Sequence, residues 1–281
     1  SVAGKRLGFK DEKRGNLFFE SMRIAKYKKP KYMIAENVKG LVNLGEVKEI
    51  IQKDFSSADD NGYIVLDPKV LHAADYGVPE SRERVIFIGI RKSELKEEAY
   101  KALMEKEVPC EYNPYPNPTH DFSSKDSELM PTVVCRDIFN GLKEPEESKD
   151  LSQANLSKAK YMGTHCQGQK EICLDKIGPT IRSEHHGNIE FRRLSKEHGG
   201  MITEELDLGM SERRLTPREC ALIQTFPPDY TFVRYKDYSR KGFALSASGA
   251  YKVIGNAVPP VLAYNIAMRL QELWSLYFKS I

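Results

Sequence analysis

Residues 84–90 read Arg-Val-Ile-Phe-Ile-Gly-Ile, the most strand-like stretch of the chain. The run is apolar and rich in β-branched side chains, and Gly89 lies near its end, so the pattern predicts a buried β-strand. A second apolar run, Lys31–Glu36 (KYMIAE), predicts another short buried strand. Shorter runs at Ile64–Leu66 and Val70–Ala74 predict two more strands.

Helical patterns alternate with these strands. Residues 16–28 carry apolar side chains at positions i, i+4 and i+7, residues 47–51 mark a second amphipathic helix, and residues 93–105 mark a third. Strands that alternate with helices are typical of the α/β class, in which helices cover the faces of a sheet. We therefore expect an α/β sheet in the first 110 residues.

The pattern changes after this point. Asn113–Pro118 (NPYPNP) is too rich in proline for regular structure, and residues 140–210 are polar and poorly periodic, which predicts a second, irregular domain. Thr216–Glu219 has the spacing of a capping box at the start of a short helix. A last helix is predicted from Pro259 to Phe278, with apolar residues along one face: Leu262, Ile266, Leu270 and Leu273.

The composition excludes several classes of protein. The 281 residues include 43 Lys and Arg against 40 Asp and Glu, and this net charge of +3 does not by itself indicate a polyanionic partner. Five cysteines without a CxxC pair exclude a zinc ribbon and favour a reducing compartment over a disulfide framework. No stretch resembles a signal peptide or a membrane span. We expect an intracellular globular protein.

Seven short strings occur in order along the chain: 1–9 (SVAGKRLGF), 14–20 (RGNLFFE), 35–38 (AENV), 76–84 (YGVPESRER), 213–219 (RRLTPRE), 225–227 (TFP) and 255–258 (GNAV). Together they closely resemble the DNA (cytosine-5)-methyltransferase family, from just after its catalytic-loop cysteine to its C-terminus. The resemblance implies an α/β fold: part of a Rossmann-like sheet that binds S-adenosylmethionine (SAM), with a smaller irregular target-recognition domain. It assigns residues 1–110 to the catalytic domain, 111–245 to target recognition and 246–281 to a segment that returns to the catalytic domain.

The resemblance also shows which motifs the sequence lacks. It contains neither the family's glycine-rich SAM loop nor its Pro-Cys-Gln nucleophile motif. Its one Pro-Cys pair, Pro109-Cys110, is followed by Glu111 and comes after the 76–84 motif, which is the wrong order for the family's nucleophile. We therefore expect this chain alone not to methylate DNA. The missing N-terminal half would belong to the same gene product or to a separate subunit. The alternative is a catalytically inactive module that binds specific DNA.

The family's chemistry needs charge at the edge of the target cytosine. Glu36 matches the family's carboxylate at N3 and the exocyclic amine, and if burial keeps the carboxyl protonated it can donate a proton to N3. Alone, it would equally suit a salt-bridged or capping glutamate. Arg84 matches the arginine at O2 and Arg82 the one that supports the loop; their spacing predicts that both point to one face. Glu80 stands where the family has Gln, and can accept but not donate unless protonated.

The resemblance implies contacts with double-stranded DNA. In the loop after the nucleophile, hydroxyl and cationic groups would bind phosphates: Ser1, Lys5 and Arg14. Residues 1–40 hold eleven Lys or Arg against four Asp or Glu, which suits a phosphate backbone or a solvated surface. Thr180 and Ile181 match a dyad that holds the phosphate beside the flipped base. The residues after them would line the major groove: Arg182, His185, His186 and Asn188. In the other recognition loop the candidates are Gln167, which would fill the space of the flipped base, and Lys170.

The resemblance implies SAM as the cofactor. Residues that match positions on one side of SAM are Leu17, Asn256, Ala257 and Val258. Asn256 also suits an N-cap of the last helix.

Arg213, Arg218 and Glu219 match a motif that joins the family's two domains, and we expect them to be structural. No metal is predicted, because the His and Cys spacing fits no common ligand pattern; Cys135, Cys166, Cys173 and Cys220 are expected to be buried small hydrophobes. Solitary or restriction-linked bacterial modifiers are the expected relatives, so the expected location is the bacterial cytoplasm, associated with the nucleoid.

Overall fold

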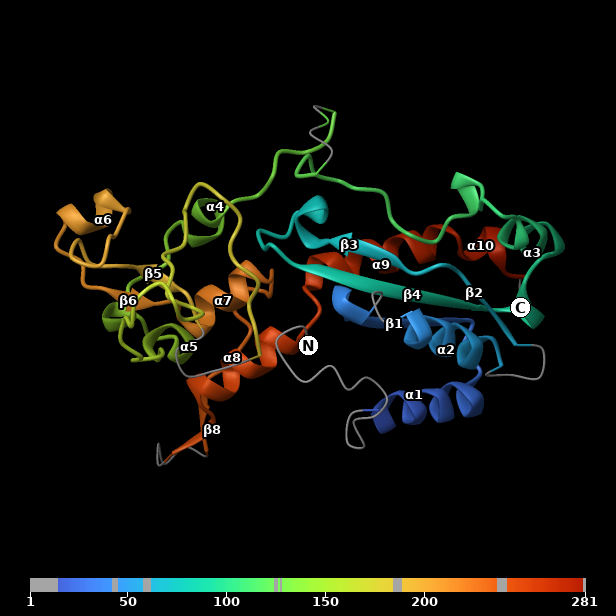
Figure 1. Cartoon of the computed structure of the whole chain (residues 1–281), viewed down its shortest axis with the longest axis horizontal. Helices are drawn as coiled ribbons and strands as arrows, with labels where there is room; N and C mark the ends of the chain where they lie inside the picture. Colours follow the sequence, from blue (N-terminus) through green and yellow to red (C-terminus); the bar gives the residue numbers. More distant parts are fainter. Residues whose placement is uncertain are drawn as a thin grey trace. The chain divides into compact units, whose positions relative to one another are not determined.

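The computed structural model of the chain describes residues 15–41, 45–57, 62–123, 126, 128–183, 189–236 and 242–279, without the side chains at 15–19, 41 and 45–48. Contacts divide these residues into two units (Figure 1). Unit 1 contains the described residues up to His72, Glu83–Asn117, and the described residues from Tyr264 onward. Unit 2 contains Ala73–Arg82 and the described residues of Pro118–Ala263. Each unit is described by itself.

The predicted strand at residues 84–90 forms the centre of unit 1. It is β4 (Glu83–Arg91), and it pairs antiparallel with β1 (Tyr32–Val38) along one edge. Along its other edge β4 pairs antiparallel with β2 (Tyr63–Val65) and then with β3 (Lys69–His72). The four predicted strands are therefore confirmed.

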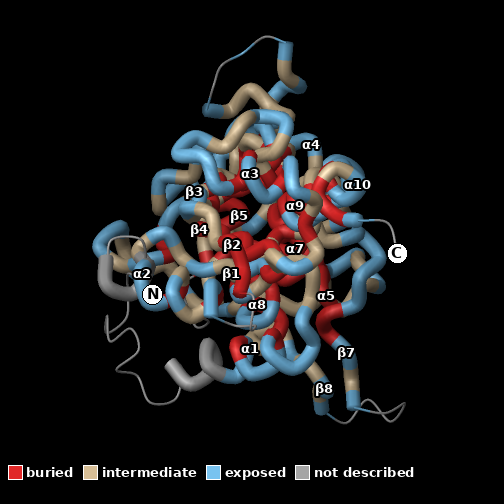
Figure 2. Tube along the Cα trace, turned by 90° about the vertical axis from the view of Figure 1, so that its right-hand side faces the viewer, coloured by how far each residue is buried: buried red, intermediate tan, exposed pale blue. Residues whose placement is uncertain are grey.

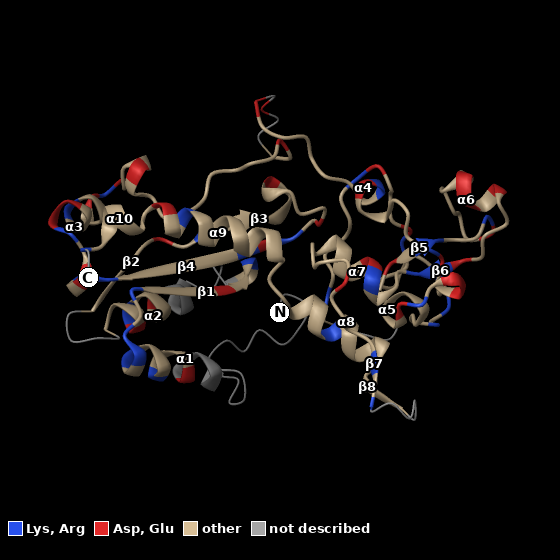
Figure 3. Cartoon of the chain, turned by 180° about the vertical axis from the view of Figure 1, so that it is seen from behind, with Lys and Arg blue, Asp and Glu red and all other residues tan. Residues whose placement is uncertain are grey.

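The predicted helices of unit 1 are also confirmed, and they cover both faces of the sheet. Figures 1 and 3 show α1 (Gly15–Lys28) and α2 (Gly45–Ser56) on one face, and α3 (Glu97–Met104) and α10 (Trp274–Tyr277) on the other. The α/β class predicted from the alternating pattern is thus observed.

Burial on both faces explains the unbroken apolar run of β4. Val85 and Phe87 join a core cluster with residues of α1, α2, β1 and β2: Met22, Ala25, Met33, Ile51, Phe55 and Tyr63. Ile86, Ile88 and Ile90 point to the opposite face, because successive side chains of a strand alternate, and they too are fully buried. Figure 2 shows the buried residues of the sheet in red.

The strand β1 differs from the prediction in two ways. Only Met33 is buried, whereas Ile34 is 50% exposed, because in the described part of the chain β1 pairs with β4 alone and leaves its other edge without a strand. The prediction of a buried strand was therefore wrong. The strand also continues to Val38, so Glu36 lies inside it and not at its end.

Unit 2 is built from short elements, as its irregular sequence predicted. They are α4 (Cys135–Phe139), α5 (Leu151–Ala154), β5 (Phe191–Arg193), α6 (Thr203–Asp207), β6 (Arg213–Arg214), α7 (Pro217–Ile223), β7 (Arg234–Tyr235), β8 (Phe243–Leu245) and α8 (Ala247–Asn256). β5 pairs with β6, and β7 with β8. The capping box at Thr216 is present: its hydroxyl accepts the amide hydrogen of Glu219, and the carboxylate of Glu219 accepts the amide hydrogen of Thr216. Apolar residues of α4, α7 and α8 form the core of this unit.

The last predicted helix is interrupted. It forms α9 (Pro260–Glu272) and then α10, with Leu273 between them, and the four predicted apolar residues are buried. The predicted boundaries at residues 110 and 245 also differ from the two units, because residues 73–82 and α8 belong to unit 2. Among the described helices, none combines the length and the apolar character that crossing a membrane requires.

Candidate functional site

Glu36 and Arg84 form an ion pair in unit 1. The register aligns Val38 with Arg84 and Glu36 with Ile86, so both charged side chains stand diagonally on one face of the sheet. Arg84 Nε lies 2.7 Å from Glu36 Oε1. The two side chains keep 12% and 26% of their surface exposed. A carboxylate and a guanidinium are therefore held together where a polar ring edge could reach both of them.

Glu36 also lines a pocket of about 600 Å³. The other lining residues come mainly from α1, β1 and α2 and are largely apolar, with Asn37 beside Glu36. A mostly apolar hollow with a few polar groups is typical of a small-molecule or base-binding site. Glu36 is 26% exposed and pairs with Arg84, which is the salt-bridged arrangement that the sequence also allows.

Arg82 has a different environment, inside unit 2. Its side chain is 1% exposed and donates hydrogen bonds to three backbone carbonyls: Ile181 (3.0 Å), Gly255 (3.0 Å) and Ala257 (2.7 Å). Arg82 precedes β4, so the strand alternation on which the prediction of one shared face rests does not extend to it, and the shared face stays a prediction. Arg82 thus binds three backbone carbonyls of unit 2, whereas Arg84 pairs with Glu36 in unit 1.

Glu80, which stands where the family's motif has Gln, is buried and hydrogen-bonded. Its side chain is fully buried, accepts the amide hydrogen of Ile181 at 2.7 Å, and lies 3.4 Å from Arg82 Nη1. A buried carboxylate is tolerated when a cation and a hydrogen-bond donor compensate it. In this structure Glu80 acts as a hydrogen-bond acceptor, which is the role that the sequence allows for an ionised glutamate.

The Thr180-Ile181 dyad is held against the segment that contains Glu80. Gly178 donates to Pro79 O and Ser81 donates to Gly178 O, both at 2.8 Å, and the Thr180 hydroxyl donates to Ser81 O. Ile181 is 2% exposed, so its side chain belongs to the core of unit 2 and not to a DNA-contacting surface. That part of the prediction was wrong; the half-buried Thr180 remains a candidate.

Gly255 shows why the next segment needs glycine. A Cβ atom at this position would lie 2.1 Å from the carbonyl carbon of Arg182, so only glycine permits the approach of the two backbones. Together with the hydrogen bonds of Arg82, this close contact joins the 255–258 segment to the Thr180–Arg182 segment inside unit 2.

The residues predicted to touch SAM are only partly open to a ligand. Asn256 is the exposed last residue of α8, and the predicted N-cap role is wrong because α9 begins four residues later. The carbonyl of Ala257 accepts a hydrogen bond from Arg82, and Val258 is half-buried. Leu17 lies in α1, but its side chain is outside the described residues. Asn256 and Val258 are thus the members of this set whose side chains are at least partly exposed, and their contact with a cofactor stays a prediction.

The other predicted DNA contacts divide into three groups. Gln167 and Lys170 are exposed, as such contacts require. Arg182 instead pairs with Glu190 at 2.8 Å; burial raises the pKa of Glu190, although Arg182 opposes this shift. The remaining candidates lie outside the described residues: Ser1, Lys5, Arg14, His185, His186 and Asn188.

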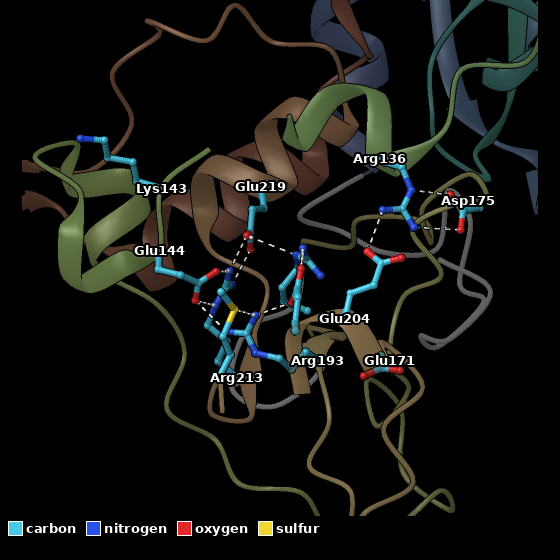
Figure 4. A network of polar contacts seen from close by, with 12 residues as sticks. Arg136, Lys143, Glu144, Glu171, Asp175, Arg193, Glu204, Arg213 and Glu219 are labelled. Carbon is cyan, nitrogen blue, oxygen red and sulfur yellow. Dashed lines mark hydrogen bonds and ion pairs between the residues drawn. The ribbon is translucent and has the colours of Figure 1, made fainter. Parts of the chain in front are cut away.

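A buried ion-pair network holds β5, β6 and α7 together (Figure 4). Arg213 donates to both carboxylate oxygens of Glu219 and of Glu144, and Arg193 donates to Glu144 as well. Burial alone would raise the pKa of Glu144, but the hydrogen bonds from Arg213 and Arg193 lower it to about 2. Arg218 binds Asp150 and the carbonyl of Tyr230. The structural role expected for Arg213, Arg218 and Glu219 fits these contacts within unit 2.

Sequence reasoning missed several members of this network. Arg192 and Arg193 are buried although arginine is usually exposed, and Glu144 lies 69 residues from its partner Arg213. The capping box pointed to Glu219, but no local pattern points to Glu144. Figure 3 shows the arginines of β5 and β6 in blue, with acidic residues in red nearby.

The cysteines match the prediction only in part. Cys135 and Cys220 are buried, whereas Cys173 is exposed and Cys166 is half-buried, so for these two the prediction was wrong. Burial raises the pKa of the Cys135 thiol to about 12 and that of Cys220 well above its usual value. Among the described residues, no three His, Cys, Asp or Glu side chains gather in a way that could hold a metal ion.

The comparison with known families decides which family the chain represents. Residues 1–272 match the model of the C-5 cytosine-specific DNA methylases. The chain belongs to this family. The roles expected for Glu36, Arg84 and Arg82 stay predictions within this family.

Individual relatives of this methylase chain support the assignment. It is 32% identical to the type II methyltransferase M.FnuDI of Fusobacterium nucleatum, over 97% of this chain and 73% of the relative. It is 30% identical to the type II methyltransferase M.BsuRI of Bacillus subtilis, over 99% of this chain and 57% of the relative. The chain thus spans only part of the length of each relative.

The fold comparison agrees with the sequence comparison. The structure resembles that of the S. pombe Dnmt2 methyltransferase with a TM-score of 0.52 at 15% identity, over 94% of this chain and 73% of the other. At this identity the likeness concerns the fold, and it confirms the methyltransferase fold that the sequence predicted.

Proposed function

We propose that this chain is the cytosine-recognising and target-recognising portion of a DNA (cytosine-5)-methyltransferase that serves type II restriction–modification. The methyl group would pass from SAM to C5 of a cytosine flipped out of a specific duplex site. The observation that carries the proposal is the Glu36–Arg84 ion pair, 2.7 Å long and partly exposed beside a pocket of about 600 Å³.

The ion pair offers the two edge contacts that cytosine requires. The carboxylate of Glu36 can accept a hydrogen bond from the exocyclic amine, and the guanidinium of Arg84 can donate to O2. Arg84 is fixed by its strand and by its bond to the carbonyl of Glu83, so the donor is oriented before a base arrives. Flipping the base costs a few kcal/mol, which contacts such as these must help to offset.

SAM would supply an electrophilic methyl group. On this chain the side chain of Asn256 and the apolar surface of Val258 would hold one side of the cofactor. Arg82 holds the backbone around Ala257 in place without facing the cofactor itself. Thr180 would contact the phosphate beside the flipped base, and the exposed Gln167 and Lys170 would contact the duplex.

We also propose that these 281 residues do not transfer a methyl group unaided. The sequence contains no Pro-Cys-Gln, and the raised pKa values of Cys135 and Cys220 keep both thiols protonated near neutral pH, whereas the attacking species must be a thiolate. The nucleophile would come from a polypeptide that carries the glycine-rich loop and the Pro-Cys-Gln motif.

Reconstitution tests the proposal directly. Methyl transfer from labelled SAM to mixed-sequence duplex DNA is measured with this chain alone and after addition of a polypeptide carrying both missing motifs. We expect activity only in the mixture. There, Glu36→Gln and Arg84→Met should each lower the rate by about a hundredfold or more, the usual scale for a positioned acid–base or electrostatic group.

Arg91→Met is the matched control. Arg91 ends the same strand and pairs with the nearby Glu94, away from Glu36, so the variant should keep the reconstituted rate. Activity of the chain alone would refute the need for an external nucleophile. Specific DNA binding without transfer in any mixture would identify an inactive binding module instead.

A further inference from the structure

Arg214 is a buried cation that the proposed chemistry does not use. It lies in β6, opposite Phe191 of β5, and is 1% exposed. Its guanidinium stacks over the Phe191 ring, 3.8 Å from the ring centroid. A cation in this position has lost its water and needs hydrogen-bond acceptors from the protein.

The acceptors of Arg214 are backbone carbonyls. Nε donates to Ala159 O at 3.1 Å and Nη2 donates to Lys160 O at 3.2 Å. Nη1 donates to the carbonyls of Gly168 and Ile189. One planar guanidinium therefore connects Ala159 and Lys160, at the beginning of the 159–170 segment, with Gly168, which lies eight residues after Lys160. A lysine could not do this, because its ammonium lacks the forked geometry.

The 159–170 segment contains no helix or strand, so these contacts replace a hydrogen-bonded ladder. The segment turns at Gly163 and Gly168, which both have positive φ angles. Inside it, the buried Gln169 accepts the amide hydrogen of Met162 at 2.8 Å. At its end, Phe191 donates to Lys170 O at 2.8 Å.

This arrangement leaves a set of side chains on the outside of the segment. The exposed ones are Lys160, Met162, Thr164, His165, Gln167 and Lys170. They combine cations with groups that can accept and donate hydrogen bonds, which is the composition of a surface that touches both phosphates and base edges. Arg214 fixes the backbone beneath these side chains without being exposed itself.

We propose that Arg214 is a positioning residue for DNA sequence discrimination: it fixes the 159–170 segment so that its exposed side chains meet the base edges in one register. The inference rests on the proposed function, because it takes this segment to contact the duplex. Phosphate attraction depends little on an ångström of loop position, whereas base-edge hydrogen bonds depend on it strongly. Loss of Arg214 should therefore lower specificity more than affinity.

The first experiment measures anchoring and does not involve DNA. The full chain and its Arg214→Lys variant are treated with trypsin under native conditions, and cleavage after Lys160 and Lys170 is compared with cleavage after the exposed Lys196. We expect the first two sites to be cut about tenfold faster in Arg214→Lys, because three carbonyls of the segment lose their donor. Unchanged relative rates would overturn the proposal.

The second experiment measures discrimination. Each protein selects from a pool of duplexes with randomised sequence, and binding to the enriched duplex is then compared with binding to a scrambled one. For Arg214→Lys we expect the ratio of the two affinities to fall about tenfold, the scale of one mispositioned base contact, while binding to the scrambled duplex stays within about twofold.

Arg193→Lys is the matched control. Arg193 is equally buried in the adjacent strand, but its partners are Glu144, Glu205 and the carbonyl of Ser211, and not the 159–170 segment. The same loss of ratio in this variant would mean general destabilisation and would overturn the proposal. If the wild-type chain enriches no duplex, the proposed function fails and the discrimination role fails with it, while the trypsin rates still show whether Arg214 anchors the segment.

Discussion

The strands β4 and β5–β6 are equally buried but bury opposite kinds of side chain. In unit 1, β4 buries isoleucine, valine and phenylalanine between two layers of helices. In unit 2, β5 and β6 bury Arg192, Arg193, Arg213 and Arg214. An aliphatic residue needs only to be removed from water, whereas a buried arginine needs acceptors at defined positions. The first core therefore tolerates similar apolar substitutions, and the second depends on each partner.

The two arginines at positions 82 and 84 show the same contrast within a single motif. Arg84 remains partly exposed beside Glu36, where it can meet a ligand. Arg82 is buried and bound to three carbonyls. One motif therefore contributes a partly exposed, ion-paired arginine to unit 1 and a buried arginine to unit 2.

The largest expected effect is the loss of Glu219. Glu219→Ala leaves Arg213 with one carboxylate partner and removes half of the capping box, so the free energy of unfolding should fall by about 3–5 kcal/mol, the scale of a broken buried ion pair. Urea unfolding followed by circular dichroism measures the change. The control is Glu204→Gln, which breaks an exposed pair with Arg136 and should cost less than about 1 kcal/mol. Equal losses in the two variants would refute the contrast between the cores.

Lowering the pH should reduce the free energy of unfolding by an intermediate amount. Arg213 and Arg193 lower the pKa of Glu144 from its usual 4.5 to about 2. A carboxylate with a lowered pKa stabilises the fold above about pH 4.5, and this contribution is lost as the pH falls towards 2. We expect a loss of about 1–3 kcal/mol from this group over that interval.

Glu144→Gln isolates this acid effect. The variant lacks the titrating carboxylate, so the difference in unfolding free energy between wild type and variant should shrink as the pH falls. Urea melts of both proteins at pH 5, 4 and 3 measure the difference. A difference that stays constant over this range would show that Glu144 does not titrate with the lowered pKa.

The smallest effect is expected in β4. Ile88→Val removes one methylene group from a fully buried position and should lower the free energy of unfolding by about 1 kcal/mol. Because no charge is involved, the loss should be the same at pH 7 and pH 4. Urea melts at the two pH values give the comparison, and a loss that changed with pH would link β4 to the ionic network of unit 2.

The regular parts of the fold could be predicted because their information is local. The run at residues 84–90, the helix at 16–28 and the capping box at Thr216 each depend on neighbours a few residues away. Burial of β1 could not be predicted, because the same apolar run suits a central or an edge strand, and only pairing distinguishes the two. The break at Leu273 likewise leaves the apolar periodicity of the last helix unchanged.

The residues of the candidate site could be predicted where they belong to recognisable sequence motifs. The residues of the Glu36–Arg84 pair were both selected from motifs, but the sequence did not show that they contact each other. The burial of Ile181 and the pairing of Arg182 with Glu190 were not visible, because both depend on segments distant in sequence or on packing. Glu144 was missed for the same reason.

The sequence by itself determined the family, the α/β class and the residue types available for contact with cytosine, because motifs and apolar periodicity are properties of the chain order. The tertiary structure alone decided which charged groups are exposed and which are buried. Arg84 and Arg82 have the same side chain, two residues apart, and only their surroundings make one a partly exposed ion-pair partner and the other a buried donor to backbone carbonyls. Whether a charged group is solvated depends on what the fold packs around it, and the adjacent residues in the sequence do not determine this.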